Sequence, residues 1–263
     1  MRETRSFKRA LLGISDPALR IEWLHDKLDR WPLDDSAQLL DAVLAESEIG
    51  DPAAREALFT IALLAVTERS RAIIEQLRRT ARAQGLLSLG RLLRTGPQPH
   101  AQVVEPDKLP VPAYSADREL SLGERRSLAR KPARTHFEKL LLDPHPMVTR
   151  LLLDNPRMTE EDALRIATLR PARPLALREL ARSHRWLRRA RVRMAILLNP
   201  GSPPELAMPL LGLCTRSQLA ELYSTVSVSM QLRSTAVELL QLRPPLPRAA
   251  QRRQRSAGDR IVH

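Results

Sequence analysis

The chain has 263 residues, of which 43% are hydrophobic and 3% aromatic, and its 43 basic and 30 acidic side chains give a net charge of +13. This length is enough for one large domain or two small ones, and the hydrophobic content is enough for a buried core. A single cysteine, Cys214, excludes an internal disulfide framework and any site that needs several cysteine ligands.

Two features of the sequence set an expectation about the compartment. The first residues lead into no long apolar stretch with a small-residue cleavage site. The longest apolar run, residues 57–66, is far shorter than the roughly 20 residues that cross a bilayer. We therefore expect a cytoplasmic protein in a reducing environment, without membrane insertion.

Residues 16–93 show the apolar periodicity of five helices. Most of their starts carry a side chain that caps helices or a proline at the first helical position. The helices are expected to begin near Asp16, Asp34, Asp51, Glu68 and Leu86. The third, ending near Val66, is apolar on nearly all sides, so we expect it at the centre of a small bundle. The alternative is that this helix contacts another chain.

Prolines are concentrated between this region and the next. Five of them fall within residues 95–113, a density that excludes helix and favours an extended connector. We therefore place an N-terminal helical region at residues 1–95 and a linker at residues 96–118. The alternative is an ordered loop that lies along the following domain.

Residues 143–213 contain a repeat. The stretches 148–156 and 192–200 lie 44 residues apart, and each is an amphipathic run that ends in Asn-Pro. A residue before proline is pushed away from the α conformation, so each pair ends a helix. A fixed period of about 40–47 residues built from helix pairs is typical of an alpha solenoid.

Capping signals define the helices within the repeats and the limits of the repeat domain. Thr159 is placed to cap one helix, and Ser202 and Glu205 have the spacing of a capping box at another. Ser121 with Glu124 begins the domain in the same way. We predict an all-α fold, with an alpha solenoid of HEAT-like helical repeats at residues 119–243, preceded by a small helical bundle. Residues 244–263 are expected to form a basic, disordered tail.

The residues around the first repeat carry a family resemblance. Asp143-Pro-His-Pro-Met-Val-Thr-Arg150, followed by Asp154-Asn-Pro-Arg-Met-Thr159, resembles the bacterial leucine-rich repeat variant and, more loosely, HEAT repeats. The resemblance covers about residues 126–213 and implies stacked helices. It departs from the pattern at Ser183-His184, where Asn-Pro would be expected. The founding member of that family pairs its repeats with a cysteine-ligated iron–sulfur cluster, which the single cysteine here cannot hold.

Catalytic and metal-binding patterns are not visible in the sequence. The six histidines include no pair spaced three or four residues apart, as a helix-borne metal site would need. The nine glycines form no phosphate-binding loop. One arrangement stays open, because Cys214 beside His184 would imitate a nucleophile and its base. A buried, inert cysteine is the alternative, and we expect no enzyme, no cofactor and no metal.

Arginines are concentrated in the most basic part of the chain. Residues 1–50 have a net charge of −3 and residues 151–200 a net charge of +6. We expect one helix from Trp186 to Leu198, with like charges as close neighbours on it. These charges predict an anion-binding surface for a partner, formed by Arg182, Arg185, Arg188, Arg189 and Arg193. The alternative is a solvated face in an arginine-biased chain, since 38 arginines stand against five lysines.

The expected function follows from the repeats and the charge. A solenoid offers an extended surface, so we expect a non-enzymatic binding or scaffold module that recognises a protein partner with an acidic surface. The alternative is a nucleic-acid-binding helical-repeat protein whose arginines contact phosphates.

Overall fold

The computed structural model describes residues 2–96, 109–114, 118–131 and 134–244. All regular elements within these ranges are helices, which confirms the all-α prediction. No helix among the described residues has both the length and the apolar character needed to cross a bilayer.

The N-terminal region is a helical bundle with α4 at its centre. Helix α4 packs against α1, α2 and α3, and its residues 57–64 are all buried, as expected for the helix that is apolar on nearly all sides. Asp16 and Asp51 cap α2 and α4 with their carboxylates. The bundle helices are α1 (Arg2–Gly13), α2 (Pro17–Arg30), α3 (Leu33–Glu48), α4 (Pro52–Ala65), the 3-10 helix η1 (Glu68–Ser70), α5 (Arg71–Gln84) and α6 (Leu87–Leu92).

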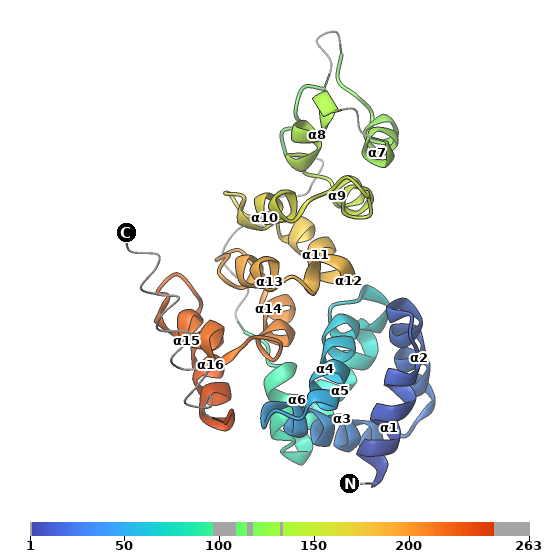
Figure 1. Ribbon diagram of the computed structural model, residues 1–263, viewed down its shortest axis with the longest axis vertical. Helices are drawn as coiled ribbons and strands as arrows, with labels where there is room; N and C mark the ends of the chain where they lie inside the picture. The colour runs from blue at the N-terminus through green and yellow to red at the C-terminus, as the bar shows by residue number, and fades with distance from the viewer. Residues whose placement is uncertain (1, 97–108, 115–117, 132–133, 245–263) are drawn as a thin grey trace.

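Helices α7 to α13 stack into a column that extends away from the bundle, and α14 packs against α4 and α6 of the bundle (Figure 1). Helix α9 packs between α7 and α11 in one layer, and α10 packs between α8 and α13 in the other. The bundle lies beneath α12 and beside α14 in this view. The helices are α7 (Leu122–Arg130), α8 (Arg134–Leu141), α9 (Pro146–Leu153), α10 (Glu160–Thr168), α11 (Pro174–Arg182), α12 (His184–Leu187), α13 (Ala190–Leu197), α14 (Pro204–Leu211), α15 (Arg216–Ser224) and α16 (Met230–Leu242).

The two asparagines of the chain, Asn155 and Asn199, tie α9 to α7 and α13 to α10. Both are buried. The Asn155 amide donates to Ala129 O and Arg130 O at the end of α7, over 3.4 and 3.2 Å. The Asn199 amide donates to Ala167 O, near the end of α10, over 2.7 Å. Each therefore satisfies carbonyls that a helix C-terminus leaves without partners.

The other half of each asparagine side chain shapes the turn that follows. Asn155 Oδ1 accepts from the backbone N–H of Arg157 at 2.9 Å, and Asn199 Oδ1 accepts from that of Gly201 at 3.0 Å. The two Asn-Pro segments therefore make matching hydrogen bonds, one segment in each layer of helices.

Most of the expected caps are present. Ser121 with Glu124 and Thr159 with Asp162 form capping boxes. The box predicted for Ser202 with Glu205 is wrong. Pro203 takes the N-cap position, and the Ser202 hydroxyl instead donates to Ile196 O over 2.5 Å. The two consecutive prolines move the helix start past Ser202, since a residue before proline is pushed away from the α conformation and both Ser202 and Pro203 precede one.

The helix predicted from Trp186 to Leu198 is also wrong, because it is broken in two. Helix α12 ends at Leu187, and Arg189 is the extended N-cap of α13, with φ −77° and ψ 115°. The break allows the indole of Trp186 to be buried, with Nε1 donating to Leu153 O at 2.9 Å.

Two buried clusters meet at α4. One fills the bundle and contains Leu58, Ile61 and Leu64. The other fills the stacked helices and contains Phe59 and Leu63 from the opposite side of the same helix. The contact is close, since a Cβ on Gly212, just beyond α14, would lie 3.0 Å from Leu58 Cδ2.

Part of the expected linker packs against the stacked helices. Tyr114 is buried, and its hydroxyl donates to Asp143 Oδ2 over 2.7 Å. Asp143 also receives the Arg125 guanidinium at 2.7 Å. Burial and the hydrogen bond to the Asp143 carboxylate both raise the pKa of Tyr114. Residues 97–108 and 115–117 of the linker, and the tail from residue 245, lie outside the described residues.

Candidate functional site

Two of the predicted arginines, Arg182 and Arg188, lie where the stacked helices meet the bundle. Arg182, at the end of α11, donates from Nε to Val66 O over 3.0 Å. Its Nη2 pairs with Glu68 at 2.9 Å, and its Nη1 pairs with Glu179 at 2.8 Å. Arg182 thus links the stacked helices to the turn after α4. Its planar guanidinium can donate to several acceptors at once.

Arg188 makes a second link between the two regions. Its Nη2 pairs with Glu56 of α4 at 2.6 Å, and its guanidinium lies 4.7 Å from the centre of the Phe59 ring. Its Nε donates to His184 Nε2 over 3.0 Å. Burial and the neighbouring charge of Arg188 lower the pKa of His184, so the imidazole accepts this hydrogen bond in its neutral form.

Arg185 and Arg193 donate hydrogen bonds to other parts of the stacked helices. Arg185 donates to Asn155 O at 3.0 Å and to Met158 O at 2.9 Å, and it lies over the Trp186 ring. Arg193 donates to Leu187 O at 2.7 Å and to Arg188 O at 3.0 Å, which satisfies carbonyls at the break between α12 and α13. Burial lowers the pKa of Arg193.

Arg189 differs from the other four. It is exposed, and within the described part of the chain its side chain forms no hydrogen bond or ion pair. The five arginines therefore do not present one open surface, because four of the guanidinium groups already have acceptors. Their role in binding a partner stays a prediction.

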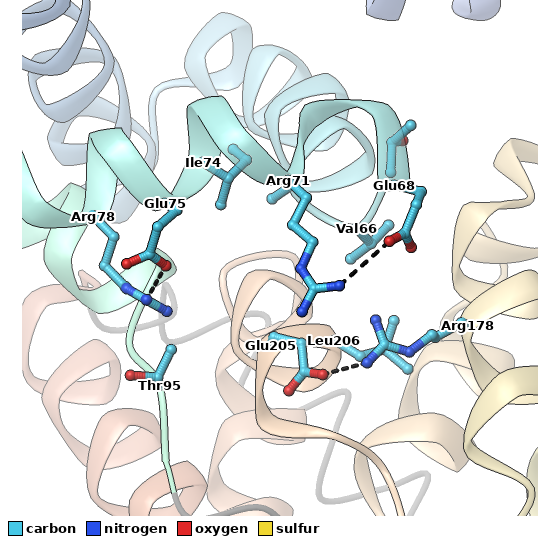
Figure 2. Close-up of a pocket in the computed structure, with 12 residues that line it drawn as sticks. Val66, Glu68, Arg71, Ile74, Glu75, Arg78, Thr95, Arg178, Glu205 and Leu206 are labelled. Atoms are coloured by element: carbon cyan, nitrogen blue, oxygen red, sulfur yellow. Dashed lines mark hydrogen bonds and ion pairs between the residues drawn. The ribbon is translucent and has the colours of Figure 1, made fainter.

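A cleft of about 250 Å³ lies beside this boundary, between the η1–α5 segment and helices α11 and α14. Figure 2 shows three ion pairs in its walls: Arg71 with Glu68, Arg78 with Glu75, and Arg178 with Glu205. The lining therefore contains three arginines and three glutamates, and its charges balance. Such a cleft does not concentrate anions as a surface of one sign would.

The cleft pairs differ in exposure. The Arg71 side chain is 85% exposed and lies 3.5 Å from Glu68, which also receives Arg182. The Arg178 and Glu205 side chains are only 30% and 36% exposed. The Arg178–Glu205 pair thus lies deeper and joins α11 to the first turn of α14, while Arg71 stays at the solvent edge.

The Cys214–His184 pairing is not formed. Cys214 is fully buried, its Sγ donates to Leu210 O at 3.6 Å, and burial raises the pKa of the thiol to about 12. His184 instead contacts Arg188 and Phe59. Among the residues with described positions, no three His, Cys, Asp or Glu side chains gather as metal ligands would.

Nothing in the sequence indicates several of the ion pairs at this boundary. Glu56 and Glu68 are separated from their arginines by 132 and 114 residues. Arg94, at the end of the bundle, pairs with Glu238 of α16 at 2.8 Å. No local spacing marks such pairs, because the fold alone brings them together.

Comparison with known proteins adds no relative to this description. No family model, no curated protein and no solved structure matches the chain.

Proposed function

We propose that the chain is a non-enzymatic binding or scaffold module that recognises an acidic protein surface. The observation that carries this proposal is the uneven distribution of charge over a surface of stacked helices. Residues 2–96 contain 15 basic and 14 acidic side chains, a net charge of +1. Residues 118–244 contain 22 basic and 12 acidic side chains, a net charge of +10. The stacked helices therefore attract anionic partners.

The finer architecture belongs to the same proposal. Residues 119–243 form a short alpha solenoid that resembles HEAT-like repeats and the leucine-rich repeat variant. Support comes from the two layers of helices and from the matching geometry of Asn155 and Asn199. In such proteins each helical unit contacts mainly its neighbours, which leaves long faces free for a partner.

Intramolecular contacts favour a protein partner. The guanidinium groups of Arg182 and Arg188 form ion pairs with glutamates of the bundle. These arginines therefore already bind carboxylates of a helical neighbour. A bidentate guanidinium matches a carboxylate in geometry as well as charge. The alternative, a nucleic-acid-binding repeat protein, is favoured by the same net charge of +10.

The deciding experiment is a pull-down from a native lysate with the full-length chain, carried out with and without nuclease. We expect the captured proteins to remain after nuclease treatment. Loss of the captured proteins with nuclease, together with sub-micromolar binding of duplex at about 150 mM salt, would refute the proposal and select nucleic acid.

A further inference from the structure

Three helices of one layer share a common register. In α9 the buried positions include Thr149 and Leu153. The buried pair Leu177 and Ala181 occupies the same positions 28 residues later in α11. The buried pair Arg125 and Ala129 occupies them 24 residues earlier in α7. Because α9 packs against both neighbours, residues that match in this register lie side by side on successive helices.

The register identifies the residues on the outer face of the layer. The residue after the first buried position, and the residue four positions later, point away from the core, since a helix turns by about 100° per residue. These outer residues are Arg178 and Arg182 in α11, Arg150 and Asp154 at α9, and Arg126 and Arg130 in α7.

On α11 this outer face is already covered by acidic groups. Arg178 pairs with Glu205 in the first turn of α14, and Arg182 pairs with Glu68 at the start of η1. Both carboxylates therefore stand at the beginning of another helix. The molecule shows in this way what kind of group the outer arginines of the layer bind.

Among the described residues, no acidic group covers the same positions on α9 and α7. Arg150 and Arg130 are exposed, and Arg126 has a buried Nε without a hydrogen-bond acceptor. None of these three side chains forms an ion pair within the ranges that the structure describes. The bundle lies beneath α12, so it does not reach α7 (Figure 1).

We propose that Arg126, Arg130 and Arg150 form a docking surface, the α7–α9 arginine face, for an acidic helix of a partner protein. This inference rests on the proposed function and names the surface that carries it. The docked helix continues the interface that Glu68 and Glu205 make on α11. Neighbouring helices of a layer lie about 8–10 Å apart, so carboxylates two turns apart on one helix match arginines on both α7 and α9.

Asp154 favours this partner over a phosphate backbone. It occupies the outer position of α9 that matches Arg130 and Arg182, and it is exposed. A phosphate backbone carries charge at every nucleotide and would meet this carboxylate. A helix can instead place a neutral or basic side chain opposite it.

The test uses the full chain and a labelled synthetic helical peptide with glutamates spaced three and four residues apart on one face. The test variant combines Arg126→Glu, Arg130→Glu and Arg150→Glu. Its control combines Arg5→Glu, Arg9→Glu and Arg82→Glu, which are exposed on the bundle and lack ion pairs among the described residues. Both variants change the net charge equally, so a difference between them reports position rather than total charge.

We expect peptide affinity to fall at least about tenfold in the test variant and to stay within about twofold of wild type in the control. Arg150→Ala should weaken binding less. Asp154→Asn should strengthen binding about two- to threefold, because it removes a repulsive carboxylate. A gain of this kind cannot come from misfolding, so it keeps the test valid if the triple variant is unstable.

Two results would overturn the inference. Equal peptide binding by the test and control variants, with tight binding by wild type, places the surface elsewhere and leaves the proposed function standing. Tighter binding of an RNA duplex than of the peptide at about 150 mM salt, lost only in the test variant, makes the occupant nucleic acid and refutes both.

Discussion

Replacing Asn199 with alanine tests whether the two asparagines hold the stacked helices together. The substitution leaves Ala167 O and the Gly201 N–H without their partners at a buried junction. An unsatisfied buried polar group costs about 1–3 kcal/mol. We therefore expect Asn199→Ala to reduce the free energy of unfolding by about 2–4 kcal/mol, measured by urea denaturation.

Asn199→Asp distinguishes the loss of the donated hydrogen bond from a simple packing effect. Asn199→Asp keeps the acceptor for Gly201 but places a carboxylate oxygen against Ala167 O, where the amide donated over 2.7 Å. We expect it to be more destabilising than alanine at pH 7, by about 1–2 kcal/mol.

The pH dependence of the stability of Asn199→Asp tests the same donor role. Burial beside a carbonyl raises the pKa of an introduced carboxyl above its ordinary value of about 3.9, and the protonated form can donate. The variant should therefore regain stability as the pH falls from 7 towards about 5. Gln241→Ala, on the exposed side of α16, is the control. An aspartate variant as stable as the alanine variant at pH 7, with no gain at lower pH, would refute the donor role.

Three further outcomes are expected. Leu152→Ala, in the fully buried centre of α9, should lose about 2–5 kcal/mol in urea unfolding; a neutral result would contradict its core position. Because the pKa of His184 is lowered on folding, stability should be full above pH about 6.5 and fall below it, and His184→Gln should remove this pH dependence. A double-mutant cycle on Arg188 and Glu56, whose side chains are 45% and 38% exposed, should give a coupling of about 0.5–1 kcal/mol; additive losses would mean that the pair does not link the two regions.

The sequence predicts the helices better than it predicts their contacts. Local rules predict the capping box at Ser121, the capping role of Thr159 and the helix ends at both asparagines, because each depends on residues a few positions apart. Helix α1 went unpredicted although Thr4, Phe7 and Leu11 are spaced three and four apart as on a buried face.

The candidate site shows the limit of sequence reasoning more clearly. Composition identified the arginine-rich segment, but nothing local indicates that Arg188 pairs with Glu56, 132 residues away. The break at Arg189 was missed as well, because the burial of Trp186 against Leu153 O decides it. Tertiary contacts outweigh helix periodicity there.

Helix α4 ties the stability of the bundle to that of the stacked helices. Leu58, Ile61 and Leu64 belong to one core, and Phe59 and Leu63 belong to the other. Removing either half would expose buried apolar side chains on one side of this helix, so neither half has a complete interior of its own. The chain is therefore expected to unfold as one cooperative unit, with a single calorimetric transition. A protease cut within residues 97–108 should leave two pieces that remain associated until both unfold.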